Sequence, residues 1–148
     1  MANINWICKH FDLLTPHELY AMLQLRCQIF VVEQNCVYLD IDNNDYCYHL
    51  MGFDGDLLVA STRLLGPNTV YEEMSIGRVV NAVSHRGRGI GQALMNNSIE
   101  HCYRLYGKGT IKIGAQLYLK RFYESFGFVQ TGDIYLEDDI KHIKMLKK

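Results

Sequence analysis

The sequence predicts a mixed α/β domain with one central sheet. Apolar runs with the length and pattern of strands alternate along the chain with segments of helical spacing. No internal repeat, low-complexity tract or linker interrupts this order. The chain has 148 residues, the length of one domain, and a domain of this size buries roughly 70% of the surface of its unfolded form. We therefore expect a single domain over residues 1–148.

The first predicted elements are a strand and a helix. The apolar stretch over residues 4–11 predicts the strand. The helix is predicted over residues 15–29, where apolar side chains recur with helical spacing. Thr15 can cap its N-terminus, Pro16 occupies the first helical position, and Glu18 completes a capping box with Thr15.

A loop, a hairpin and a further strand follow. Residues 31–47 are rich in Asp and Asn, which predicts a loop. The apolar runs 48–53 and 57–65 are separated by Asp-Gly-Asp at residues 54–56, a strong hairpin signal. The next apolar run, 74–80, predicts a strand that leads into a glycine-rich segment.

The second half of the chain predicts two helices and three strands. A helix is expected over residues 91–106, where apolar side chains share one face before a glycine ends the pattern. A short strand at 110–115 and a short helix at 118–126 come next. Late strands are expected at 128–131 and 142–146.

Composition excludes several classes of partner. The formal net charge is −1, so the chain has no global basic field for nucleic acid or an anionic membrane. Apolar residues make up 49% and charged residues 21%, which is typical of a globular protein. We expect neither a nucleic-acid nor a membrane partner, and the sequence leaves a homodimer open.

The cysteines and histidines predict no metal site. The five cysteines are odd in number and lack C-x-x-C spacing, which argues against a disulfide framework or a zinc site and fits a reducing compartment. The six histidines lack H-x-x-x-H spacing. The N-terminus is polar and charged, and no apolar run approaches the roughly 20 residues of a membrane-spanning helix. We expect a cytoplasmic protein.

The segment SHRGRGIGQALM, residues 84–95, predicts an anion site. It lies between a predicted strand and a predicted helix, and backbone N–H groups at a helix N-terminus attract anions such as phosphate. Its pattern is R-x-x-G-x-G at Arg86, Gly89 and Gly91, which is neither a Walker loop nor the dinucleotide motif G-x-G-x-x-G. From these residues alone, a tight turn with exposed arginines is an equal alternative.

A second segment, GAQLYLKRFYESFGF over residues 114–128, resolves that ambiguity. An amide residue, Gln116, ends a strand, Tyr123 follows on a helix seven residues later, and Gly127-Phe128 open the next strand. In this order and spacing, the two segments resemble the two most characteristic regions of the GNAT N-acetyltransferase superfamily.

The resemblance extends over nearly the whole chain. Residues 26–45 and 135–145 are similar to the ElaA-type branch of the superfamily. This implies the GNAT fold, a strongly twisted mixed sheet of about six or seven strands flanked by helices. In that fold two neighbouring parallel strands splay apart and admit the pantetheine arm of acetyl-CoA. Here they would be residues 74–80 and 110–115.

Acetyl-CoA is the co-substrate that the resemblance implies. Backbone amides of residues 86–91, the glycine loop, would hold the pyrophosphate of acetyl-CoA. The Arg86 and Arg88 side chains would add charged contacts. The backbone of Val79 and Val80 would pair with the pantetheine amides as an added strand does. The expected acetyl-CoA contacts are therefore Val79, Val80, Arg86, Gly87, Arg88, Gly89, Ile90, Gly91 and Gln116.

The implied reaction is acetyl transfer to a primary amine of a small molecule or peptide, by direct attack in a ternary complex. Tyr123 occupies the family's general-acid position, although an aromatic residue on that helix face would also serve packing alone. Many relatives place a carboxylate base on the strand before the loop, but residues 75–81 contain none. Glu73 and Glu33 are the substitute candidates, and Glu72 or a chain of water molecules could also take the amine proton.

Three further polar residues, Asp42, Asp45 and His49, could line an acceptor pocket together with Glu33, although solvated loop side chains are the simpler interpretation. Two other functions stay open. A non-catalytic acyl-CoA binding or sensing module could use the same fold. Residues 26–34 also faintly resemble the acyl-homoserine-lactone synthases, whose longer C-terminal half this chain lacks.

Overall fold

The computed structural model describes residues 3–148, which form a seven-stranded sheet with helices on both faces. The strands are β1 (Asn5–His10), β2 (Tyr48–Asp54), β3 (Leu57–Leu65), β4 (Met74–Asn81), β5 (Ile111–Gln116), β6 (Val129–Glu137) and β7 (Ile140–Lys147). The α-helices are α1 (Pro16–Arg26), α2 (Ile90–Tyr106) and α3 (Lys120–Glu124). The sheet order is β1-β2-β3-β4-β5-β7-β6, and this mixed architecture confirms the predicted fold class.

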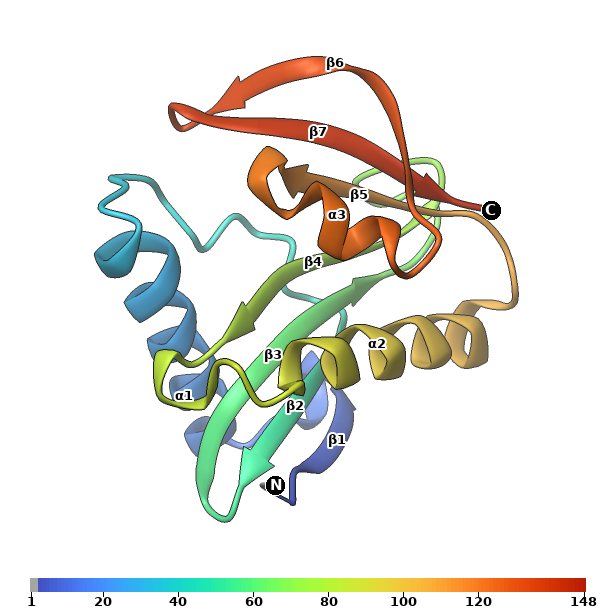
Figure 1. Cartoon of the computed structure of the whole chain (residues 1–148). Coiled ribbons are helices and arrows are strands. Elements are labelled where there is room, and N and C mark those ends of the chain that lie inside the picture. The colour runs from blue at the N-terminus through green and yellow to red at the C-terminus, as the bar shows by residue number, and fades with distance from the viewer. Residues whose placement is uncertain (1–2) are drawn as a thin grey trace.

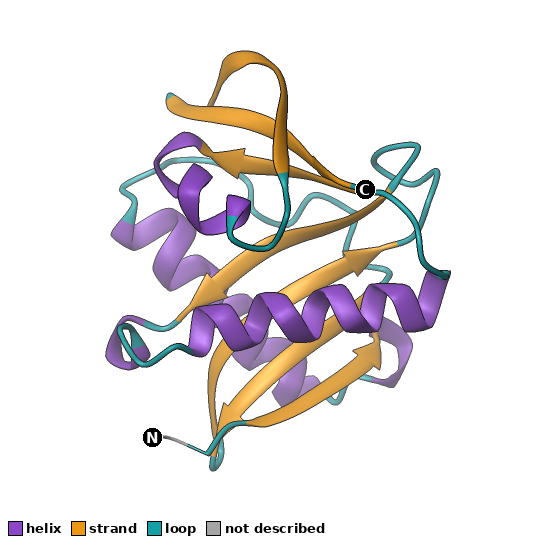
Figure 2. Ribbon diagram, turned by 45° about the vertical axis from the view of Figure 1, so that its right-hand side comes forward, coloured by secondary structure: helices purple, strands orange, loops and turns teal. Residues whose placement is uncertain are grey.

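The helices divide the core into layers. Figure 2 shows α2 on one face of the sheet and α1 on the other. Met95 and Cys102 of α2 pack with buried residues of β3, β4, β5 and β7, and Tyr123 of α3 joins the same cluster. Met22 and Leu25 of α1 form a separate cluster on the opposite face. No helix within residues 3–148 is long and apolar enough to cross a bilayer.

The start of α1 follows the predicted capping box. The Thr15 hydroxyl accepts a hydrogen bond from the Glu18 backbone N–H at 3.1 Å, and the Glu18 carboxylate accepts one from the Thr15 N–H at 2.8 Å. The helix then continues beyond its predicted end as the π-helical segment η2 (Cys27–Glu33). The prediction of a loop from residue 31 was therefore wrong over its first three residues. Two β-branched valines at 31 and 32 weaken the helical signal, but the backbone there forms i→i−5 bonds, such as Gln34 N–H to Ile29 C=O at 3.1 Å.

The C-terminal strands are longer than the sequence predicted. β6 and β7 form one hairpin, whereas two short strands at 128–131 and 142–146 were expected. Its turn is Asp138-Asp139, and both residues adopt positive φ, 51° and 63°. Two-residue hairpin turns with positive φ at both positions usually have the sequence Asn-Gly or Asp-Gly, which makes them recognisable in a sequence. Asp-Asp can adopt this conformation but is not a typical turn sequence, so the turn was not predicted. The pairing of β6 with β7 is also irregular between Thr131 and Tyr135, which makes β6 harder to recognise as one strand.

β4 and β5 separate along their length. They are the parallel pair of the sheet, and their register extends only over Met74↔Ile111 and Ser75↔Lys112. Beyond these pairs the strands diverge, as Figure 1 shows. Arg78 in β4 has φ +48°, and the register with β3 shifts between Ser61 and Arg63 opposite it. A bulge of this kind bends a strand, and it turns β4 away from β5 and opens the sheet.

Candidate active site

A cavity of about 670 Å³ occupies the gap between β4 and β5. Its walls come from β4, β5, η2, α2 and α3, and from the β6–β7 turn. Seven of the residues singled out from the sequence line it: Glu33, Val79, Val80, Arg86, Gly91, Gln116 and Tyr123. Beyond Ser75 the edge of β4 that faces the cavity has no register with β5, so a ligand with amide groups can pair there as an added strand does.

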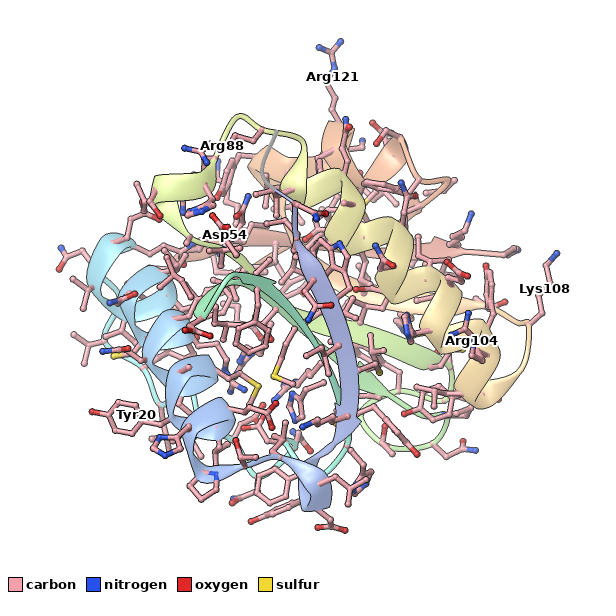
Figure 3. The ribbon with its side chains drawn as sticks, turned by 90° about the horizontal axis from the view of Figure 1, so that it is seen from below. Tyr20, Asp54, Arg88, Arg104, Lys108 and Arg121 are labelled. Carbon is pink, nitrogen blue, oxygen red and sulfur yellow. The ribbon has the colours of Figure 1, made fainter. Side chains whose placement is uncertain are left out.

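The glycine loop has the geometry of an anion site. Gly87 and Gly89 adopt left-handed backbone conformations, with φ +76° and +75°, and Gly89 is the N-cap residue of α2. Among the described residues, 3–148, no side chain caps this helix, so its first backbone N–H groups are left for an external acceptor. Ile90 is buried and anchors the helix start in the core, while Arg88 projects from the loop (Figure 3).

A buried histidine that the sequence analysis did not single out fixes this loop. His85 lies in the short turn η3 (Val83–His85) and is 7% exposed. Its Nε2 lies 2.8 Å from Oδ2 of Asp54 in the β2–β3 hairpin, and its Nδ1 lies 2.7 Å from the Ser84 hydroxyl. Through these contacts His85 joins the start of the glycine loop to the β2–β3 hairpin, which helps to hold the loop in place.

Arg86 is held across the cavity mouth by Glu33. Its two terminal guanidinium nitrogens donate to the two carboxylate oxygens, both at 2.7 Å. These hydrogen bonds hold the pKa of Glu33 below its usual range. A carboxylate with a lowered pKa is a weaker base, so its pairing with Arg86 makes Glu33 a weaker proton acceptor than an unpaired carboxylate.

If the cavity binds acetyl-CoA, as the resemblance to the GNAT superfamily implies, replacing Glu33 with glutamine should tighten that binding several-fold without lowering kcat. The change removes a negative charge beside the proposed anion site. It also leaves the terminal guanidinium nitrogens of Arg86 available to donate to phosphate oxygens. Calorimetric titration and steady-state kinetics measure the two effects. Glu100→Gln is the matched control, because Glu100 makes an exposed i,i+4 pair with Arg104 on α2, away from the cavity. A large fall in kcat would instead make Glu33 the catalytic base.

Tyr123 lies at the inner wall of the cavity on α3. It is 5% exposed and packs edge-on against Phe122 and Phe128, with ring centroids 5.2 and 6.2 Å away. Burial raises the pKa of its hydroxyl well above the ordinary value, so the group stays protonated at neutral pH. Gln116 pairs its side-chain amide with that of Gln34 in both directions, at 3.2 and 3.3 Å, and so joins β5 to the loop that follows η2.

Asp42, Asp45 and His49 lie outside this cavity. The two carboxylates belong to a partly buried cluster in which three arginines alternate with three aspartates: Arg26, Arg63 and Arg78 with Asp40, Asp42 and Asp45. Arg26 donates to Asp40 and Asp45 at 2.8 Å each, and Arg63 binds both oxygens of Asp42 at 2.7 Å. The cluster ties the loop before β2 to α1, β3 and β4. The ion pairs give Asp42 and Asp45 a structural role, which fits neither an acceptor pocket nor the simpler expectation of solvated loop side chains. His49 is fully buried, with Nε2 2.8 Å from the Asp45 carbonyl.

The ion pairs of this cluster predict that the fold loses stability in acid. Burial opposes the charged forms of Asp42 and Asp45, but hydrogen bonds from Arg63 and Arg26 outweigh it and hold both pKa values below their usual range. Groups with depressed folded-state pKa values stabilise the fold above the unfolded value, near 3.9, and lose that contribution as pH falls through the folded values. We expect the free energy of unfolding to fall steeply below about pH 4. Urea titrations across pH measure it. Asp42→Asn should flatten this slope, and the exposed Asp133→Asn should not.

Glu73 is also outside the cavity. It immediately precedes β4, at the end where β4 and β5 are still paired and far along the strand from the glycine loop. The cavity is also lined by polar residues that were not singled out from the sequence, among them Arg78, Glu137 and His142. Among residues 3–148 no three His, Cys, Asp or Glu side chains gather in a way that could hold a metal ion.

Comparison with known proteins identifies the family. The profile of the acetyltransferase (GNAT) domain matches residues 28–148. The chain belongs to the GNAT acetyltransferase family. Over 148 residues it is 42% identical to protein ElaA of Escherichia coli K12, with 98% of this chain and 97% of that protein covered.

Solved structures agree with this membership. An acyl-CoA N-acyltransferase from Pseudomonas aeruginosa superposes with a TM-score of 0.94 at 41% identity, covering 99% of this chain and all of that one. The AHL synthase LasI superposes with a TM-score of 0.81 at 12% identity, covering 99% of this chain and 90% of that one, which shows a common fold alone. The expectation that such synthases have a longer C-terminal half that this chain lacks was therefore wrong for LasI. The resemblance to the GNAT superfamily and its ElaA-type branch is therefore confirmed.

Proposed function

We propose that this GNAT protein transfers an acetyl group from acetyl-CoA to a primary amine of a small molecule or peptide. The observation that carries the proposal is the cavity between the diverging strands β4 and β5, which ends at the uncapped N-terminus of α2. A helix start with free N–H groups suits a pyrophosphate, and an unpaired strand edge suits the amides of pantetheine. Both features lie along one cavity in the order in which CoA presents them.

The residues of the loop and of β4 bind the co-substrate in this proposal. The N–H groups from Gly87 to Gly91 hold the pyrophosphate, and Arg86 and Arg88 add charge-assisted contacts at the mouth. The backbone of Val79 and Val80 aligns the pantetheine arm, and a free N–H near Val79 faces the thioester oxygen. The thioester is already activated, so binding and orientation supply much of the catalysis.

Tyr123 is the general acid of the proposed reaction. The amine attacks the thioester carbon directly in a ternary complex, the C–N bond forms and the C–S bond breaks. The electron pair leaves on sulfur, and the Tyr123 hydroxyl supplies the proton that this thiolate takes. The buried position of Tyr123 in the cavity wall and its retained proton support this role.

Free CoA release in the presence of a panel of amines tests the proposal. The release should require both acetyl-CoA and an amine, and it should rise with pH as the amine loses its proton. Amino acids, polyamines, peptides with free N-termini and lysine side chains cover the acceptor classes. Tight acetyl-CoA binding without amine-dependent release from any member of the panel would favour a non-catalytic acyl-CoA sensor on the same fold.

A further inference from the structure

His142 on β7 presents a buried imidazole to the cavity. It is 7% exposed and lines the same space as Val79 and Tyr123. The register of the sheet places it opposite Gln116, the last residue of β5, where β4 and β5 have already separated. The side chain therefore stands at the open end of the gap, beside the β6–β7 turn.

The hydrogen bonds of the ring determine which nitrogen can act as a base. Nδ1 lies 2.7 Å from the backbone carbonyl of Ile140. Because a carbonyl oxygen can only accept, Nδ1 carries the hydrogen and, in the neutral ring, Nε2 keeps a free lone pair. Nε2 lies 3.5 Å from Oε2 of Glu137. A proton placed on Nε2 would therefore face a carboxylate that can stabilise the positive ring.

The surroundings of the ring are mixed in charge. On β6, Tyr135 stacks on the imidazole with ring centroids 5.7 Å apart, and Glu137 is the nearby carboxylate. On β7, the Lys144 ammonium group lies over the ring of Tyr135 and donates a hydrogen bond to the Tyr71 hydroxyl, so its charge is directed to these two side chains. Asp138 in the turn and Arg78 on β4 line the same cavity, and Arg78 is paired with Asp40 and Asp42.

We propose that His142 is the catalytic base, a role that rests on the proposed acetyl transfer. Nε2 takes one proton from the acceptor's ammonium group, and the free amine then forms the C–N bond with the thioester carbon. When the C–S bond breaks, Tyr123 protonates the sulfur, and the second proton lost by the nitrogen restores Tyr123. His142 returns its proton to water, so the reaction releases amide, CoA thiol and one proton. Glu137 is a positioning residue that acts through the ring.

The alternatives from the sequence fit this role less well. Glu33 is engaged by both terminal nitrogens of Arg86, and Glu73 lies outside the cavity. Residues 75–81 carry no carboxylate. His142 combines burial, access to the cavity and an assigned lone pair, which none of these carboxylates does.

His142→Asn tests the base directly. An asparagine amide can donate to the Ile140 carbonyl from the place of Nδ1, but it lacks Nε2. At pH 7 we expect kcat/KM for an amine acceptor identified in the panel to fall by about 10²-fold or more, the usual contribution of a positioned base. Above the acceptor's own pKa the loss should shrink to within about tenfold, because the amine then arrives without its extra proton. Nitrogen-detected NMR of the wild type should show the ring protonated on Nδ1.

Controls separate this role from a loss of structure. The thermal midpoint and the acetyl-CoA dissociation constant of His142→Asn should stay near the wild-type values. His101→Asn is the matched control, since His101 also bonds a backbone carbonyl through Nδ1, that of Asn97, but does not line the cavity. An equal loss at every pH, wild-type kinetics, or a ring protonated on Nε2 would overturn the role of His142 alone. A wild type that acetylates no amine would overturn the proposed function and this role with it.

Discussion

Replacing Gly89 with valine is expected to remove most of the affinity for acetyl-CoA while the sheet stays folded. Gly89 holds φ +75° at the N-cap of α2, a conformation that a β-branched residue avoids. A Cβ atom added at Gly89 would meet no atom of residues 3–148 within 4 Å, so we attribute the effect to the backbone and not to a clash within the protein. Strain of this kind costs about 1–3 kcal/mol, and relieving it would turn the loop amides away from the pyrophosphate. We expect a loss of about 10–10²-fold in affinity.

Gly89→Asn is the matched control for this prediction. Asparagine tolerates the left-handed region far better than valine does, and the space around Gly89 admits its side chain. Calorimetric titration with acetyl-CoA should therefore rank wild type and Gly89→Asn well above Gly89→Val. Thermal unfolding should show that both variants remain folded. Equal affinity in all three proteins would remove the glycine loop from the binding site.

Tyr123→Phe is expected to slow turnover by about 10²-fold or more, with little change in acetyl-CoA affinity. The phenylalanine ring keeps the packing against Phe122 and Phe128 and removes only the hydroxyl. The departing thiolate then has no positioned proton donor, whereas the phosphate contacts at the other end of the cavity are untouched. Steady-state kinetics and a binding titration measure the two parts. Because burial raises the pKa of Tyr123, deprotonation of this residue should not limit wild-type turnover up to about pH 10, the ordinary tyrosine value.

Tyr103→Phe is the matched control for Tyr123→Phe, because it also removes a tyrosine hydroxyl. Tyr103 is partly buried on α2 against the same core cluster as Tyr123, but it does not line the cavity. This variant should keep wild-type turnover. If Tyr123→Phe did the same, the thiolate would leave without help from the protein, and Tyr123 would be a packing residue of the core.

Local sequence signals predicted the elements that local interactions form. The capping box at Thr15 and Glu18 produces the start of α1, and the Asp-Gly-Asp turn produces the β2–β3 hairpin. The elements that were missed depend on context. The Asp138-Asp139 turn adopts a glycine-like conformation without glycine, and η2 continues past valines that disfavour a helix. Neither feature follows from periodicity or turn composition.

In the candidate site, too, the residues that depend on local motifs could be predicted and those that depend on long-range contacts could not. The glycine loop and Tyr123 lie in contiguous motifs, so the sequence could name them. The contacts of Asp42 and Asp45 with arginines on α1, β3 and β4 are long-range, and nothing in the loop composition reveals them. His142 reaches the cavity only through the pairing of β7 with β5, and the tautomer of its ring depends on a single backbone carbonyl. The cavity lies where β4 and β5 are no longer paired beyond Ser75, beside the irregular backbone at Arg78, and neither feature follows from the sequence pattern.

Transfer of an isotope-labelled acetyl group is the most direct test of the proposed chemistry. The wild-type protein is incubated with acetyl-CoA labelled in the acetyl carbons and with the amine that gives the fastest CoA release, and the products are separated by mass spectrometry. The proposal predicts one labelled acetyl group in amide linkage on the amine for each CoA released. Label recovered as free acetate, or acetyl-CoA left unconsumed beside every amine, would contradict it.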